Sequence, residues 1–208
     1  MHPHQTMSLK DLIYNDPFIS HWRENYNANL KSRVFYGENT KPLIWLINNK
    51  YYQNIPVILI SAGPSLDKNI SYLKNIQKQA IILCVDVVLF KLLENGVKPD
   101  FVVNIDPSNS ITRYWHNLET SDLTLVCPTT AHPELFETWK GRFILFNQAD
   151  VDNSPKGIAL KKLTKETANF GSIFNQYFVG ATLFQFVTLF QPSLCIFMGF
   201  DFAYTGGK

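Results

Sequence analysis

Three aspartates directly follow apolar, strand-like segments: Asp86, Asp106 and Asp201. In a fold of alternating strands and helices, carboxylates in such positions can bind ribose or base hydroxyls, or a divalent cation. Mg²⁺ typically takes one or two carboxylates together with the phosphates of its ligand. A strand-end Asp can also simply cap the next turn. For Asp86 or Asp106 alone both interpretations stay open, whereas the two together favour a ligand site.

A glycine turn, "SAGPS" at residues 61–65, joins another apolar segment to a helical pattern. The chain has neither GxGxxG nor GxxxxGK[ST] here, which excludes the usual dinucleotide fingerprint and the Walker loop. A strand, a tight turn and a helix capped by Ser65 would still expose backbone N–H groups, and a helix N-terminus carries about half a positive charge. The pattern predicts phosphate binding at Gly63, Pro64 and Ser65, with a plain tight turn as an equal alternative.

Short, continuous apolar segments must position these residues. They lie at 57–61, 80–85, 101–105, 123–127, 142–146 and 194–199. Continuous rather than alternating apolar character is typical of strands buried on both faces. Helical patterns lie between several of them, as at 66–78 and 87–96. The sequence therefore predicts an α/β fold with a mainly parallel sheet and helices on both faces, which would collect the three aspartates and the turn at one edge.

Two other stretches do not follow this alternation of apolar segments and helical patterns. Residues 1–55 carry helical spacing in pieces, interrupted at Pro17 and Pro42, and are expected to form a helical N-terminal flank. Residues 149–175 are polar and rich in lysine, and they are long for a connection. We expect that stretch to be a mobile flap over the site, with its lysines on a solvated face.

Composition excludes several classes of protein. The chain has 208 residues, 46% hydrophobic and 17% charged, with a formal net charge of +2. These values are those of an ordinary globular protein, and the lack of a basic run argues against nucleic acid as a partner. No apolar run reaches the roughly 18 residues of a membrane span. The ending "FDFAYTGGK" resembles a loop, so we expect a fragment of a longer protein.

The cysteines and the N-terminal residues indicate the cellular compartment in which the protein is expected. Cys84, Cys127 and Cys195 lie far apart inside apolar segments, so free, buried thiols are expected. The first residues, "MHPHQTMSLKDL", lack the apolar core of a secretory signal. Both features favour a cytoplasmic protein.

Three motifs, in this order, carry a resemblance to a known family: "ISAGPSLDKNISYLK", "VKPDFVVNIDP" and "MGFDFAYTGGK". Residues 56–208 resemble the domain shared by archaeal 6-hydroxymethylpterin diphosphokinases and bacterial motility accessory factors, which are implicated in glycosylating flagellin with nonulosonic acids. The "GPSL" turn also looks like the nucleotide-binding turn of bacterial sialyltransferases that use CMP-sugars. The resemblance implies a Rossmann-like domain that binds a nucleotide or nucleotide-sugar.

The resemblance also implies roles for a second turn. Where the family tends to have Gly-Gly-Ser at the start of the helix before the last strand, this chain has Gly180, Ala181 and Thr182. Gly180 and Thr182 are carried over as nucleotide contacts, and Ala181 departs from the pattern.

The leading functional hypothesis is a transferase of the accessory-factor type, which moves a sugar from a nucleotide-sugar such as a CMP-sugar to a protein acceptor such as flagellin. Asp86 and Asp106 would hold ribose, base or metal, with Asp106 as the ligand if Mg²⁺ takes part. Asp106 and Asp201 would be catalytic, and Asp201 would face the transferring group. One alternative is pyrophosphoryl transfer from ATP to a pterin alcohol, which should show as an aromatic slot near the strand ends. Another is a nucleotide-binding domain without catalysis.

Overall fold

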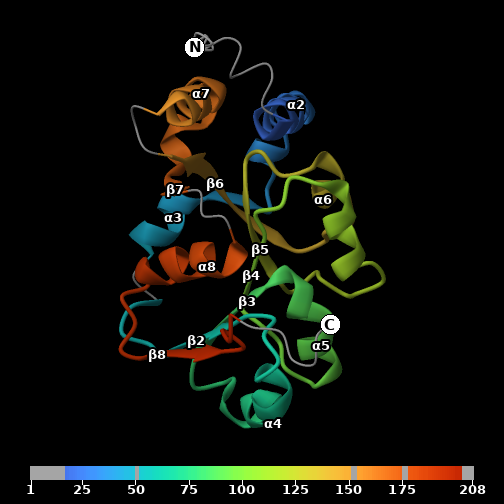
Figure 1. The fold of residues 1–208 in the computed structure, drawn as a ribbon, viewed down its shortest axis with the longest axis vertical. Helices are drawn as coiled ribbons and strands as arrows, with labels where there is room; N and C mark the ends of the chain where they lie inside the picture. Colours follow the sequence, from blue (N-terminus) through green and yellow to red (C-terminus); the bar gives the residue numbers. More distant parts are fainter. Residues whose placement is uncertain (1–16, 50–51, 151–153, 175–177, 203–208) are drawn as a thin grey trace, which may run out of the picture.

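The computed structural model describes residues 17–49, 52–150, 154–174 and 178–202. Within these residues, eight strands form one sheet in the order β1-β6-β5-β4-β3-β2-β8, with β7 beside β6, and every pairing is parallel (Figure 1). The strands are β1 (Thr40–Pro42), β2 (Val57–Ile60), β3 (Ile81–Val85), β4 (Phe101–Val103), β5 (Thr124–Pro128), β6 (Arg142–Ala149), β7 (Ser172–Phe174) and β8 (Cys195–Met198). The predicted parallel α/β fold is confirmed.

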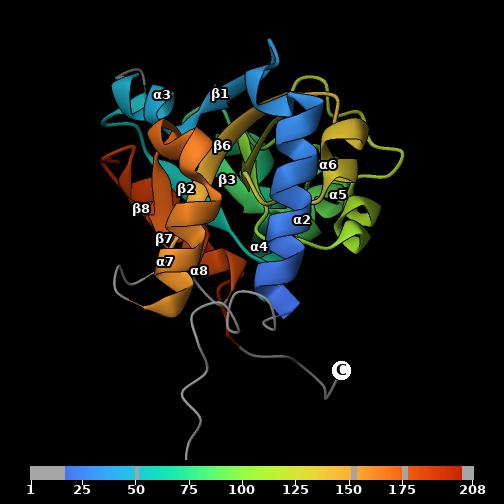
Figure 2. The same cartoon turned by 90° about the horizontal axis from the view of Figure 1, so that it is seen from above.

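Helices cover both faces of the sheet (Figures 1 and 2). They are α2 (Pro17–Ser32), α3 (Leu43–Asn48), α4 (Leu66–Ile76), α5 (Leu89–Glu94), α6 (Pro133–Thr138), α7 (Pro155–Leu163) and α8 (Val179–Thr188), with 3₁₀ turns η1 (Val34–Tyr36), η3 (Asp86–Val88), η4 (Asn109–Tyr114) and η5 (Lys165–Phe170). α4, α5 and α6 connect neighbouring strands from β2 to β6 and lie on one face, since such crossovers are right-handed. α8 returns to the other side of β2 across the opposite face.

The burial of the strands explains why their sequences are continuously apolar. Every residue of β2, β3, β4 and β5 is buried, because helices pack on both faces of the central sheet. β8 differs because it is an edge strand, and its Ile196 and Phe197 are 38% and 48% exposed. Gly96 follows α5 with a φ of 71°, a left-handed backbone conformation that favours glycine after a helix.

The N-terminal flank shares the sheet and the core with the rest of the chain. Its helix α2 agrees with the prediction, but residues 40–42 form strand β1, which pairs with β6. Tyr26, Phe35 and Leu43 belong to the same hydrophobic core as the central strands. The predicted boundary at residue 55 is therefore not a break in the core, and β1 escaped prediction because "TKP" has no apolar pattern.

Residues 149–175, expected to be a mobile flap, have regular structure and buried anchors in their described part, and their mobility stays a prediction. Residues 154–174 form α7, η5 and β7, and β7 extends the sheet beside β6. Leu160, Phe170 and Ile173 are buried and fix these elements to the body of the protein. Residues 151–153 and 175 lie outside the described residues. The lysines gave the stretch a polar composition, although it also contains these buried apolar residues.

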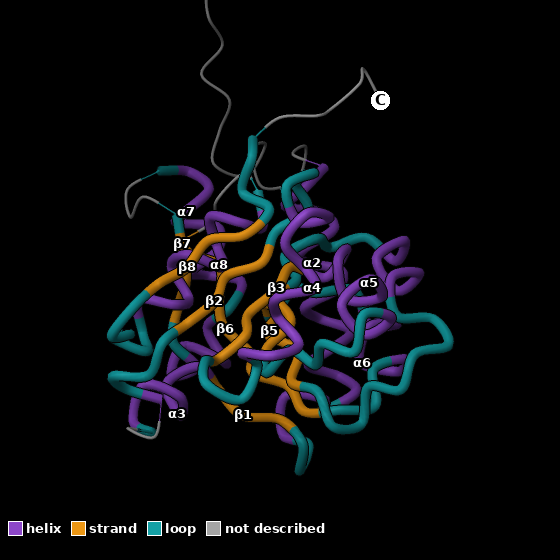
Figure 3. The backbone as a smooth tube through the Cα atoms, turned by 90° about the horizontal axis from the view of Figure 1, so that it is seen from below, coloured by secondary structure: helices purple, strands orange, loops and turns teal. Residues whose placement is uncertain are grey.

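The parallel sheet brings the carboxyl ends of all its strands to one edge, which we call the carboxyl edge. Figure 3 shows the strands as one continuous twisted layer between the helices. Asp86 follows β3, Asp106 lies three residues after β4, and Asp201 lies three residues after β8. The expected placement of the three aspartates along one edge is therefore found. Among the described helices, none is both long and apolar enough to cross a membrane.

Candidate functional site at the carboxyl edge

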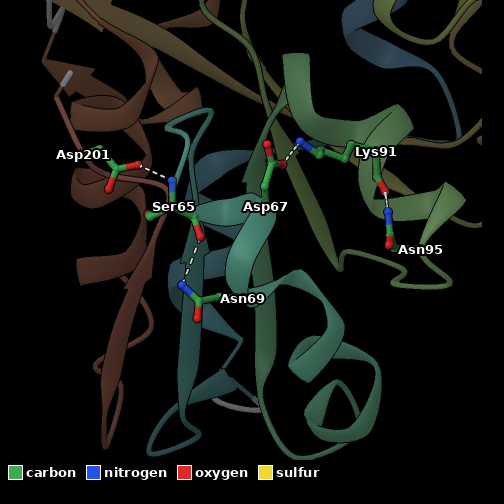
Figure 4. A network of polar contacts seen from close by, with 6 residues as sticks. All are labelled: Ser65, Asp67, Asn69, Lys91, Asn95 and Asp201. Atoms are coloured by element: carbon green, nitrogen blue, oxygen red, sulfur yellow. Dashed lines mark hydrogen bonds and ion pairs between the residues drawn. The ribbon is translucent and has the colours of Figure 1, made fainter. Parts of the chain in front are cut away.

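The glycine turn after β2 is closed by contacts within the protein. The Ser65 N–H donates to Asp201 Oδ2 at 2.7 Å (Figure 4). The Gly63 N–H donates to the Gly199 carbonyl at 2.7 Å. Pro64 has no N–H. Ser65 is at the predicted N-cap position of α4, but its side chain makes no capping hydrogen bond. The Gly63 and Ser65 amides are therefore not free, and the Asp201 carboxylate already takes the place of an anion at Ser65.

Two glycines allow this close approach between the exits of β2 and β8. A Cβ on Gly63 would lie 2.3 Å from Asp201 Oδ2, and one on Gly199 would lie 2.1 Å from the Ser61 carbonyl oxygen. Gly199 also has φ +70°, which favours glycine. Hydrogen bonds from Ser65 hold the pKa of Asp201 below its ordinary value. The glycines of this turn are therefore explained by packing of the chain against itself.

Beyond the turn, polar side chains of α4 and α5 extend the contacts shown in Figure 4. Asp67 forms an ion pair with Lys91, and Asn69 Nδ2 donates to the Ser65 carbonyl at 3.0 Å. These contacts fix the first turn of α4, and with it the orientation of the glycine turn.

Asp86 is a buried carboxyl group at the end of β3. It is 5% exposed, accepts a hydrogen bond from the Val87 N–H at 2.7 Å and another from Asn104 Nδ2 at 2.8 Å. Burial raises its pKa to about 6, the nearby Asp106 adds to the rise, and the two hydrogen bonds oppose it. Asp86 can therefore change its charge close to neutral pH.

Asn104, one residue after β4, has an acceptor without a partner. The residue is fully buried, and its Oδ1 makes no hydrogen bond to any described residue. A buried oxygen of this kind costs about 1–3 kcal/mol when left unsatisfied. The sequence prediction missed Asn104. The detectable signal was a polar residue inside the apolar run "FVVNI", where a buried strand rarely carries one.

Asp106 lies beside this pair and is exposed. Its Oδ1 accepts a hydrogen bond from the Ser108 N–H at 2.8 Å, so it does cap the following turn. That contact occupies one oxygen and, within the described part of the chain, no hydrogen bond engages Oδ2. Both interpretations of Asp106 that the sequence left open therefore remain compatible with the geometry. Among the described residues, no three His, Cys, Asp or Glu side chains gather as a metal-binding group.

A buried polar layer continues along the carboxyl edge from β4 to β6, and the sequence prediction missed most of it. Its contacts are Thr129 Oγ1 to Asn147 Oδ1 (2.9 Å), Thr130 Oγ1 to Gln148 Oε1 (2.9 Å), Thr167 Oγ1 to Asn147 Oδ1 (2.8 Å), and Asn25 and Asn29 of α2 to loop carbonyls. His132 Nδ1 accepts the Glu134 N–H at the start of α6, a capping role. Helix α2 is thus hydrogen-bonded, through Asn25 and Asn29, to the loops of the carboxyl edge.

Gly180 and Thr182 lie in the first turn of α8. Gly180 helps to line an aromatic hollow of about 460 Å³ beside β8. The hollow is lined by Phe178, Gly180, Ala181, Phe184, Phe197, Phe200 and Phe202. A Cβ on Gly180 would meet the Phe178 ring at 3.0 Å, and Thr182 is buried. No described contact joins either residue to Asp86 or Asp106, and their nucleotide-binding role stays a prediction.

Comparison with protein-family models shows which family this chain belongs to. A family model described as 6-hydroxymethylpterin diphosphokinase MptE-like matches residues 29–207. The chain belongs to the MptE-like family. The match to this family begins within α2, so it includes β1 as well as the stretch in which the three motifs were recognised.

A solved structure also resembles this MptE-like chain. It is that of the MAf glycosyltransferase from Magnetospirillum magneticum AMB-1, with a TM-score of 0.64 and 14% sequence identity. The alignment covers 100% of this chain and 32% of that one, so the chain spans about a third of that protein. At this identity the likeness supports the fold. Comparison with curated proteins gives no match.

Proposed function

We propose that this MptE-like domain binds a nucleotide-sugar at the carboxyl edge and transfers its sugar to a protein acceptor such as flagellin. The observation that carries the proposal is the group Asp86, Asn104 and Asp106, which sets an unpartnered oxygen acceptor beside two carboxyl groups. The structural relative described as a glycosyltransferase supports the sugar-transfer chemistry. A cytoplasmic location, proposed with it, rests on the sequence alone.

In this proposal the ligand is held by oxygen acceptors. Asp106, which is exposed, receives a ribose hydroxyl or a Mg²⁺ ion, and the Asp86–Asn104 pair lies behind it. Carboxylate and amide oxygens fit Mg²⁺, which usually needs only one or two protein carboxylates when phosphates supply other ligands. When bound, the ion would neutralise charge on the leaving phosphate. Phosphate at Ser65 would have to displace the Asp201 carboxylate.

Pyrophosphoryl transfer from ATP to a pterin alcohol is the second candidate. The aromatic hollow beside β8 favours it, because it lies next to Asp201 and could receive a planar ring. The family description also names this chemistry. Among the residues that the structure describes, the hollow is lined by phenylalanines, a glycine and an alanine, none of which offers a polar side chain to the nitrogen atoms of a pterin. This candidate therefore ranks below sugar transfer.

A screen of nucleotides tests the proposal. Thermal unfolding is measured with CMP, UDP, GDP and ATP, each with and without Mg²⁺. At about 100 times Kd, a ligand that binds only the folded protein adds about 2.7 kcal/mol of stability. The proposal expects a shift with a nucleotide that carries activated sugars, followed by sugar release from the matching nucleotide-sugar. A shift with ATP alone would favour the pterin candidate, and no shift with any nucleotide would overturn both.

A further inference from the structure

We infer that Asn25 of helix α2 is a positioning residue that holds Asp106 in place for ligand binding. The inference rests on the proposed function, because it assumes that Asp106 touches the ligand. Asn25 comes from the N-terminal flank, in which the sequence showed no motif.

The Asn25 side chain bridges two loops of the carboxyl edge. Its Nδ2 donates one hydrogen bond to the Pro107 carbonyl at 2.9 Å and another to the Thr130 carbonyl at 3.1 Å. Asn25 is only 8% exposed, so these bonds are largely shielded from water. Pro107 belongs to the loop after β4 and Thr130 to the loop after β5. One amide group therefore uses both of its N–H donors to hold the two loops together.

The position of Pro107 makes this bridge important for Asp106. β4 ends at Val103, and the backbone beyond it is irregular until η4 begins at Asn109. On one side of Asp106, the Asn104 N–H donates to the Val126 carbonyl at 3.0 Å. On the other side, Pro107 has no N–H to donate, so its carbonyl is the backbone group by which it can be held. Asn25 binds that carbonyl, next to the exposed carboxylate.

Asn29 provides a matched comparison. It lies four residues further along α2, on the same side of the helix. Its Nδ2 donates to the Thr129 and Ala131 carbonyls at 3.1 and 2.8 Å. Both partners belong to the β5 loop, so Asn29 makes the same kind of contact without reaching the β4 loop that carries Asp106. Loss of either amide leaves two carbonyls without their donors, but only the loss of Asn25 releases Pro107.

The experiment compares Asn25→Ala, Asn29→Ala, Asp106→Asn and the double variant Asn25→Ala/Asp106→Asn in the whole chain. The probe is the nucleotide, with Mg²⁺, that gives the largest thermal shift. We expect Asn25→Ala to weaken binding about tenfold, the size of one lost hydrogen bond to a charged group, and Asn29→Ala to weaken it less than about threefold. In the Asp106→Asn background, Asn25→Ala should add no further loss, because a residue that acts through Asp106 is not additive with it.

A second readout needs no ligand. The Ser108 amide, which donates to Asp106 Oδ1, should exchange its hydrogen faster in Asn25→Ala and at the wild-type rate in Asn29→Ala. If Asn25→Ala does not fold, Asn25→Ser is compared with Asn29→Ser, since a hydroxyl still donates one hydrogen bond.

The outcomes separate this inference from the proposed function. Equal losses of affinity in the Asn25 and Asn29 variants, or a fully additive double variant, would overturn the positioning role. If Asp106→Asn weakens binding and Asn25→Ala does not, the inference alone fails. If Asp106→Asn leaves affinity unchanged, Asp106 does not contact the ligand. The inference then fails, and the proposed function fails in the role it gives to Asp106.

Discussion

Two neighbouring regions of the carboxyl edge differ in how their polar groups are used. At the exits of β2 and β8, the Gly63 and Ser65 amides are both engaged by the chain itself. At the exits of β3 and β4, Asn104 leaves an oxygen unpartnered beside Asp86, and Asp106 is exposed. The usual rule for open α/β sheets points to the first region, because β2 lies where strand order reverses. The unused acceptors point to the second.

The difference shows that a glycine-rich turn can have a structural cause. The β2–β8 region needs its glycines so that two strand exits can pack closely. The β3–β4 region has no such signature, yet it keeps a buried carboxyl group and an unsatisfied amide oxygen, which lower stability unless they serve a ligand. We therefore expect substitutions in the first region to affect mainly folding, and substitutions in the second to affect mainly binding.

The largest effect should come from Gly199→Ala. The new Cβ would lie 2.1 Å from the Ser61 carbonyl oxygen, at a backbone φ of +70°. Backbone strain and overpacking cost about 1–3 kcal/mol each, so the free energy of unfolding should fall by about 2–6 kcal/mol in urea titrations. Gly96→Ala is the control, because it has the same φ but only the flexible Lys74 side chain nearby, at 3.5 Å. Equal losses in the two variants would show that the close packing is unimportant.

Asp86→Asn should stabilise the protein at neutral pH. Burial raises the pKa of Asp86 from 3.8 to about 6, which penalises its ionised form by about 3 kcal/mol, at 1.36 kcal/mol per pKa unit. The stability contributed by Asp86 is complete below pH 3.8 and is lost as the pH rises to about 6. With its oxygen still accepting the Val87 N–H, an amide at this position would donate to Asn104 Oδ1 once the Asn104 amide turned over, in exchange for the bond from Asn104 Nδ2. Urea unfolding should therefore favour the variant at pH 7 and show no gain near pH 3.5. Destabilisation at pH 7 would contradict this account.

Ligand binding should also depend on whether the Asp86 carboxyl group is protonated. Below pH 6 Asp86 becomes neutral, so nucleotide affinity in the presence of Mg²⁺ should fall by about tenfold between pH 7 and pH 5. In Asp86→Asn the affinity should be weak and independent of pH across this range. Calorimetric titrations at several pH values measure both. A pH profile that is the same in wild type and variant would exclude Asp86 from the site.

Asp201→Asn should have the smallest effect. The substitution removes the charge from the carboxylate that accepts the Ser65 N–H, but the amide oxygen can still accept that bond. We expect a small decrease in melting temperature and unchanged nucleotide affinity. Binding of inorganic phosphate to the variant should be no weaker than to wild type. A loss of affinity as large as that of Asp106→Asn would restore Asp201 as a ligand or catalytic residue.

The sequence predicts the parts of the fold that depend on local patterns. Six strands were recognised because each is a continuous apolar run, whereas β1 was missed because "TKP" has no such pattern. The Ser65 side chain does not cap α4, because the Asp67 and Lys68 N–H groups donate to backbone carbonyls instead. The Ser65 N–H donates to Asp201, which lies 136 residues away in the chain and could not be predicted as its partner. Asn25 had no detectable signal, since its partners are backbone carbonyls whose position only the folded sheet defines. Long-range contacts therefore limited the prediction of the site more than that of the fold.

The most direct test of the central claim is to measure nucleotide affinity and melting temperature on one sample of Asp106→Asn. The variant keeps an oxygen that can accept the Ser108 N–H, and it loses the charge. Asp122→Asn is the control, because Asp122 is an exposed acid that precedes β5 at the opposite edge of the sheet. We predict that affinity falls by about tenfold to more than a hundredfold, the equivalent of about 1.5–3 kcal/mol, while the melting temperature stays near that of wild type. Unchanged affinity for the nucleotide, at the same melting temperature as wild type or a lower one, would contradict the account.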